Sequence, residues 1–190
     1  MALAKCRFSN QSGFTLIEVL VAATILITGV VALAALFFLS IQANRAARGS
    51  TFAMVLAQQK MEQLRSLTWG FDILGLPLSD TTTDISVVPF TSGGAGLSPS
   101  PAGSLQQNTA GYVDYLDAYG NWVGSGGPIP RGTVYIRRWS IEPLPINPNN
   151  TLILQVLVTR SIDRGSADQG SVARLPDEAR LVSVKTRKTV

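Results

Sequence analysis

The sequence contains no histidine and a single cysteine, Cys6, in its 190 residues. Common zinc sites and Ser-His-Asp or Cys-His catalysis are therefore excluded, and one thiol cannot form an intramolecular disulfide bond. A lipid anchor on Cys6 would need an apolar signal core before it, and only MALAK precedes it. No phosphate-binding loop and no convincing carboxylate pair stands out either. We therefore expect no enzymatic activity, no cofactor and no bound metal.

Charged residues are also scarce. They make up 15% of the chain, whereas hydrophobic residues make up 46%, a composition that indicates a membrane-resident segment. The formal net charge is +4, and removal of residues 1–13, with Lys5 and Arg7, would leave 14 basic and 12 acidic residues, or +2. The basic pI of about 9.6 is thus weak support for a nucleic-acid partner.

A long apolar run near the N-terminus is the main positive feature. Residues 19–44 contain no charged side chain. The run exceeds the ~20 residues of a bilayer span and the ~7–15 apolar residues of a secretory signal core. We expect a membrane helix that stays attached, with Gly29 as a point where it can loosen. Lys5 and Arg7 favour a cytoplasmic N-terminus, but Arg45 and Arg48 on the other side leave the orientation open.

One carboxylate, Glu18, stands at the start of this run. An acidic side chain in a membrane span is unfavourable by roughly 2.5–3.5 kcal/mol, and an opposite charge at about 4 Å would return about 4 kcal/mol. No basic residue of the same chain can reach it along the apolar helix. If the chain were cut after Gly13, the new ammonium of Phe14 in a neighbouring copy could pair with Glu18. The alternative is that Glu18 lies at the membrane interface, neutral or snorkelled.

The stretch GFTLIEVLVA, residues 13–22, resembles the class III signal of type IV pilins and type II secretion pseudopilins. The resemblance implies that a prepilin peptidase cuts after Gly13 and that Phe14 becomes the N-methylated first residue. It also implies that Glu18 pairs with the N-terminus of an adjacent subunit, and that Thr15 and Leu16 belong to the assembly segment.

Within this superfamily, the chain is most like a minor pilin. Major pilins usually carry a proline near mature position 22, where this sequence has Ala35. The mature length of 177 residues, 190 minus 13, suits the type IV pilus modification proteins. We expect a subunit that helps initiate, prime or modify pilus assembly. A minor pseudopilin of a type II secretion system and a component of a DNA-uptake pilus stay open as alternatives.

The resemblance also implies partners and a location. The partners are other pilins or pseudopilins through the N-terminal helix, the prepilin peptidase and the inner-membrane assembly platform. The protein would cross the bacterial inner membrane once, with its N-terminus cytoplasmic and its head periplasmic, and would then enter a pilus or pseudopilus filament.

The fold is predicted as α+β and pilin-like. Met54, Ala57, Met61 and Leu64 recur at helical spacing, so one helix over residues 14–67, about 80 Å long, is expected to continue out of the membrane. The expected segments are a leader (1–13), a membrane and assembly helix (14–44), its amphipathic continuation (45–68) and a globular head (69–190).

The head is predicted as an antiparallel sheet of about four strands packed on the helix. Residues 69–84 look like loop, residues 85–90 (ISVVPF) like a short strand, and residues 91–111 like an exposed or flexible loop rich in Gly, Ser and Pro. Residues 112–123 suggest a polar turn between short strands. The strand candidates, by alternation, are residues 132–144, 151–160 and 179–188.

Two further segments allow either a binding site or an ordinary structural role. Asp114 and Asp117, close to Gly120 and Asn121, suggest either a calcium loop or a polar turn, and the turn is favoured. A set of basic and aromatic residues suggests either a patch for single-stranded DNA or strand faces with solvated arginines, and the second is favoured. That set is Arg131, Arg137, Arg138, Arg160, Trp122 and Trp139.

Overall fold

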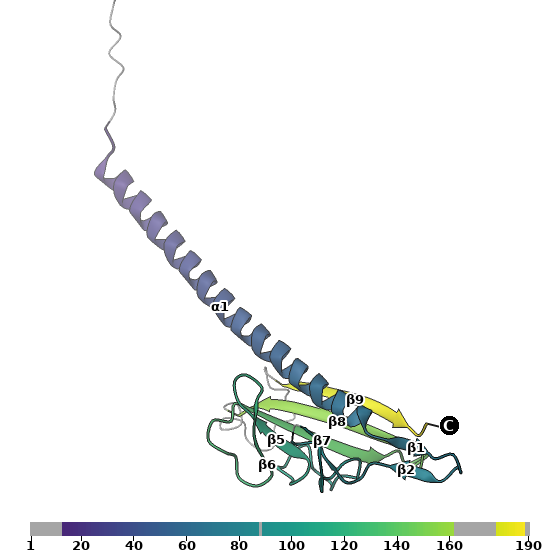
Figure 1. Cartoon of the computed structure of the whole chain (residues 1–190). Helices are drawn as coiled ribbons and strands as arrows, with labels where there is room; N and C mark the ends of the chain where they lie inside the picture. The colour runs from purple at the N-terminus through teal and green to yellow at the C-terminus, as the bar shows by residue number, and fades with distance from the viewer. Residues whose placement is uncertain (1–12, 88, 162–177, 189–190) are drawn as a thin grey trace, which may run out of the picture. The chain divides into compact units, whose positions relative to one another are not determined.

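The structure is a computed structural model that describes residues 13–87, 89–161 and 178–188. The chain divides into two compact units, one up to Arg45 and one from Ala46 onward. A single helix, α1 (Leu16–Ser66), contains the boundary between them, and the strands all belong to the second unit (Figure 1). The predicted α+β arrangement, one long N-terminal helix and a small antiparallel sheet, is confirmed.

Helix α1 begins and ends within two residues of the predicted bounds. It contains no proline, and it remains helical through Gly29, where the sequence left local loosening open. A side-chain carbon added at Gly29 would meet no atom within 4 Å, so nothing in the unit requires glycine there. In the described part of the chain, α1 is the helix long and apolar enough to span a membrane, with a mean hydropathy of 2.7 over its most apolar window.

The head contains one larger sheet and two small ladders. The larger sheet is antiparallel, with the strand order β6-β5-β7-β8-β9, one strand more than expected. The ladders pair β1 with β2 and β3 with β4. The strands are β1 (Trp69–Phe71), β2 (Pro77–Ser79), β3 (Thr83–Asp84), β4 (Thr91–Ser92), β5 (Val113–Leu116), β6 (Trp122–Ser125), β7 (Tyr135–Pro143), β8 (Thr151–Arg160) and β9 (Ala179–Thr186).

The core lies between the second part of α1 and one face of this sheet. The alternation predicted for β8 is confirmed, because Leu152, Leu154, Val156 and Val158 are all buried against the helix. On α1, the buried apolar residues are Ala53, Leu56, Ala57, Met61 and Leu64. The predicted stripe is therefore right for three of its four members, whereas Met54 is 38% exposed and lies off the core.

Two predictions for the segment after α1 are wrong. Residues 69–84 are not only loop, since β1, β2 and β3 form there. Residues 85–87 form turns and bends rather than a strand, and residue 88 lies outside the described part. Ile85 directly follows β3, in a turn, and is buried in the core, so its apolar character reflects packing rather than strand pairing.

The segment 91–111 is more closely packed than its composition suggests. Leu97 and Leu105 are buried, so the expectation of an exposed loop is wrong for these residues. The N–H of Ser100 donates to the carbonyl of Ile141 in β7, and the N–H of Ile141 donates to the Ser100 hydroxyl. The segment is therefore held against β7 by backbone hydrogen bonds at Ser100 and by the burial of Leu97 and Leu105.

Candidate functional site

The predicted processing and assembly residues lie where α1 begins. Gly13, Phe14 and Thr15 precede the helix, and both Phe14 and Leu16 are more than 80% exposed. Thr15 occupies the N-cap position, because its hydroxyl and its carbonyl oxygen accept the N–H of Glu18 at 3.3 and 3.1 Å. Thr15 and Glu18 have the Thr-x-x-Glu spacing of a capping box, so the motif also specifies where the helix starts.

The carboxylate of Glu18 is exposed in the first turn of α1, where the helix dipole favours a negative charge. No cation among the described residues pairs with this carboxylate, and none lies between it and Arg45 along the chain. The side chain is therefore available to a group from another molecule. Gly13, Phe14, Thr15, Leu16 and Glu18 all lie within residues 13–18, at one end of α1.

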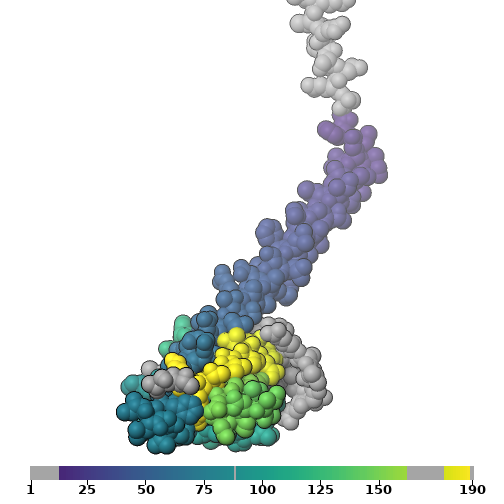
Figure 2. Space-filling model, turned by 90° about the vertical axis from the view of Figure 1, so that its right-hand side faces the viewer, coloured from purple at the N-terminus to yellow at the C-terminus, as the bar shows by residue number. Residues whose placement is uncertain are grey.

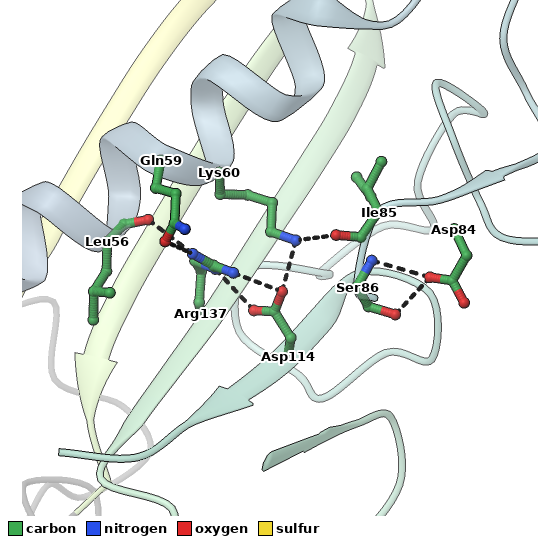
Figure 3. A network of polar contacts seen from close by, with 8 residues as sticks. All are labelled: Leu56, Gln59, Lys60, Asp84, Ile85, Ser86, Asp114 and Arg137. Carbon is green, nitrogen blue, oxygen red and sulfur yellow. Dashed lines mark hydrogen bonds and ion pairs between the residues drawn. The ribbon is translucent and has the colours of Figure 1, made fainter. Parts of the chain in front are cut away.

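The head contains a buried ion cluster formed by Lys60, Asp114 and Arg137 (Figure 3). Lys60 comes from α1, Asp114 from β5 and Arg137 from β7. The Lys60 ammonium lies 2.6 Å from Asp114, and the Arg137 guanidinium donates to both carboxylate oxygens at 2.9 and 3.0 Å. Arg137 also donates to the carbonyl of Leu56 and to Gln59, both on α1. The cluster therefore ties the helix to two strands.

The surroundings of Lys60 are unusual for a lysine. Its side chain is fully buried, donates to the carbonyl of Ile85 at 2.7 Å and lies 4.2 Å from the centre of the Trp139 ring. Burial lowers the pKa of Lys60 to about 8, against the opposing attraction of Asp114, while the nearby Arg137 lowers it further. Two cations thus share one carboxylate inside the head.

The sequence analysis missed this cluster, although a signal was present. Lys60 lies three residues after Ala57 and four before Leu64, within the apolar stripe of α1. A cation at such a position needs a buried acidic partner, since isolated charges are rarely buried. The acidic partner is Asp114. The sequence analysis considers this residue only together with Asp117, as part of a calcium loop or a polar turn.

The calcium interpretation of that pair is contradicted. Asp114 is fully buried and paired with Lys60 and Arg137. Asp117 is half-buried and accepts the N–H groups of Tyr119 and Asn121, and its hydrogen bonds, first of all that from the Asn121 side chain, lower its pKa. The two carboxylates have separate partners, so the favoured alternative, a polar turn between β5 and β6, is confirmed.

The basic and aromatic patch is contradicted as well. Arg138 and Trp139 are fully buried and Arg137 nearly so, so these three cannot contact bases. Trp122 is 46% exposed and Arg131 is exposed, but they lack the three buried members of the predicted patch. Successive residues of β7 point to opposite faces of the sheet, so Arg137 faces α1, whereas Arg138 faces away and donates to the side chain of Asn108. Solvated arginines, the favoured alternative, are also wrong for these two positions.

Comparison with known proteins identifies the N-terminal segment. Residues 8–36 match the family described as "Prokaryotic N-terminal methylation motif". No curated protein and no solved structure matches the chain significantly. The match confirms a class III signal, and it supports the predicted membership of the type IV pilin and pseudopilin superfamily.

The same match bears on the processing, partners, location and activity of the protein. The signal implies processing by a prepilin peptidase and incorporation with other pilins. Its apolar helix fits a pilin anchored in the inner membrane. Proteins of this class are generally structural subunits and not enzymes.

Proposed function

We propose that this chain is a minor type IV pilin that helps to initiate, prime or modify pilus assembly. The observation that carries the proposal is Glu18, an exposed carboxylate without a described partner at the head of an apolar, charge-free helix. After cleavage behind Gly13, the methylated amino group of Phe14 in an adjacent subunit pairs with Glu18. Thr15 and Leu16 then lie in the same contact, with Thr15 fixing the first turn.

The minor role rests on Ala35 and on the mature length. Helix α1 continues through Ala35 without the proline usual in major pilins. The proposed segments are the leader 1–13, the assembly helix 14–44, its continuation 45–68 and the head 69–190. The N-terminus faces the cytoplasm and the head the periplasm before the subunit enters a filament. An apolar N-terminal helix that carries Glu18 would also suit a minor pseudopilin of a type II secretion system.

Filaments sheared from cells test the proposal. Mass spectrometry should find peptides from residues 71–190 at low stoichiometry in sheared filaments of the wild type. Glu18→Ala should still insert and lose its leader, but should be depleted from filaments because the intersubunit ion pair is lost. Glu62→Ala is the matched control, since Glu62 is an exposed glutamate of the same helix outside the apolar run, and it should incorporate normally.

Each contrary result has a distinct meaning. Undiminished incorporation of Glu18→Ala would refute the proposed ion pair. If mature wild-type protein were plentiful in the envelope but missing from sheared filaments, the chain would instead be a pseudopilin, or its role would be confined to initiation by copies that stay in the cell.

A further inference from the structure

Strand β9 forms one edge of the larger sheet. Among the described residues it pairs only with β8 along Ala179–Thr186. Just beyond the strand, Lys188 uses its other side: its N–H donates to the carbonyl of Trp69, and its carbonyl accepts the N–H of Phe71. Figure 2 shows β9, in yellow, at the surface of the head. No described strand therefore pairs with Val182, Val184 and Thr186 on the side of β9 where Lys188 bonds to β1.

The backbone geometry indicates which groups face this open side. Arg187 donates its N–H to Asn150, toward β8, whereas the neighbouring Lys188 bonds away from it. Because backbone groups alternate in direction along a strand, the N–H and carbonyl groups of Val182, Val184 and Thr186 point to the open edge. These are the groups that an added strand would bind.

Part of the β9 edge carries apolar, β-branched side chains rather than charged ones. Val182 and Val184 are 60% and 59% exposed, and residues 179–186 contain no proline. β-branched side chains favour pairing with another strand, and natural proteins usually avoid leaving a long strand of this kind open. An exposed, β-branched, proline-free edge is therefore a candidate binding surface.

A groove of about 610 Å³ runs beside this edge, between β9, β1 and the end of α1. Its lining combines apolar side chains with cations, among them Phe71, Leu78, Val184, Arg65, Lys185 and Lys188. The groove can hold the side chains of an extended segment while the edge of β9 binds its backbone.

The charges at this surface select the partner. The Lys185 ammonium already donates to the carbonyls of Arg65 and Leu67, and burial, followed by the neighbouring Lys188 and Arg65, lowers its pKa. Glu62 is the acidic residue in the lining, and it lies 3.4 Å from Arg65. The ammonium of Lys188 has no described ion-pair partner, so the groove keeps an excess of positive charge.

A second copy of the chain is a poor occupant of the edge. Pairing β9 with another β9 would bring together two strands rich in cations, and like charges across strands are destabilising. The cations of residues 178–188 are Arg180, Lys185, Arg187 and Lys188, against the single acid Glu178.

We propose that the open edge of β9 and its groove bind an extended acidic segment of another protein, which adds a strand to the sheet. This surface goes beyond the proposed pilin function and does not depend on the N-terminal motif.

Binding of synthetic peptides to the full-length protein in detergent micelles tests this proposal. The probe is an end-blocked peptide of sequence TVEVTVE, and its counterpart TVKVTVK has the opposite charge. The acidic peptide should bind, more weakly at high salt, and should protect the amides of Val182, Val184 and Thr186 from hydrogen exchange. The basic peptide should bind at least about tenfold more weakly.

Val184→Pro is the decisive variant. The Val184 N–H points to the open edge, so proline there removes a donor needed by the added strand but leaves the ladder with β8 intact. It should weaken the acidic peptide by about tenfold or more while the protein stays folded. Lys188→Glu should also weaken it, because its ammonium lines the groove. Arg131→Glu, at the β6–β7 connection next to the other edge strand, is the charge-matched control and should not.

Three results would overturn the proposal: no binding of the acidic peptide at about 1 mM, equal binding of the basic peptide, or unchanged binding by Val184→Pro. Val184→Thr, which keeps the N–H and the β-branched shape, should bind like the wild type. It thereby separates loss of the edge donor from loss of fold.

Discussion

Asp114 is the residue on which the charge balance of the head depends. It carries the single negative charge between two buried cations, Lys60 and Arg137. Its bidentate contact with Arg137 is a balanced pair by itself. Lys60 is then the surplus charge, compensated by the Ile85 carbonyl and the face of Trp139. The three residues should therefore respond differently to substitution.

We predict that Asp114→Asn destabilises the protein far more than Lys60→Met. The first change leaves two buried cations without a carboxylate and should lower the free energy of unfolding by about 3–5 kcal/mol. The second leaves the Asp114–Arg137 pair intact and mainly orphans the Ile85 carbonyl, a loss of about 1–3 kcal/mol. Thermal unfolding in mild detergent, followed by near-ultraviolet circular dichroism, would measure both. Equal losses would show that the Asp114–Arg137 pair is not a balanced pair without Lys60.

The same lysine predicts a pH dependence of stability. Its pKa is about 8 in the folded protein, against 10.5 without the protein environment. Between these values the unfolded chain binds more protons than the folded one, so the free energy of unfolding should rise with pH from about 8 to about 10.5. Lys60→Met should remove this rise. Effects of Lys185 and Tyr112 remain in both proteins and cancel in the comparison. A rise that persists in Lys60→Met would contradict the assignment.

At the scale of elements, the two parts of helix α1 differ in the burial of their side chains. Up to Arg45 its side chains are exposed, as an apolar helix awaiting lipid or other helices would be. From Ala53 to Leu64 one of its faces is buried against the sheet. Because the helix is unbroken at Gly29, a substitution there can test whether assembly requires the helix to open locally.

We predict that Gly29→Ala leaves assembly unchanged. Alanine favours helix over glycine by roughly 0.5–1 kcal/mol, and a side-chain carbon at this position meets no atom within 4 Å. The variant should therefore keep its helix and enter filaments in wild-type amounts, as judged by circular dichroism in micelles and by peptide counts from sheared filaments. Reduced incorporation with an intact helix would indicate that subunits open or pack closely at Gly29.

At the scale of the whole molecule, the hydrophobic core belongs to the second unit. All of its buried members lie at or after Ala53, and the first unit ends at Arg45. The apolar helix up to Arg45 therefore adds nothing to this core. The remaining part of α1, in contrast, supplies one whole side of it.

We predict that residues 46–190 fold as a soluble head, whereas residues 69–190 do not. The longer fragment keeps Ala53, Ala57, Met61, Leu64 and the Lys60 ammonium. The shorter one exposes the helix-facing side of the sheet and leaves Asp114 without Lys60, with the free-energy loss of large core deletions. Dispersed amide spectra and cooperative melting should be seen for the first fragment only. A folded shorter fragment would show that the sheet is stable without α1.

Much of the molecule follows from local pattern. The apolar run and the spacing of Ala57, Met61 and Leu64 predict α1, because helix period and length are local properties. Alternation in residues 151–160 likewise predicts β8 and its buried face. The motif at Gly13–Glu18 identifies the signal because its chemistry lies in consecutive residues. Thr15 adds a cap that the same spacing specifies.

The sequence by itself determined the signal, the membrane-type helix and the α+β class. Only the tertiary structure decided the partners of charged residues. Arg137 meets Asp114, 23 residues away, and the Leu56 carbonyl, 81 residues away, and no local period encodes such a meeting. The open edge of β9 depends equally on strand order. Periodicity shows which face of an element is apolar, whereas strand order and register decide what each buried charge or free backbone group faces.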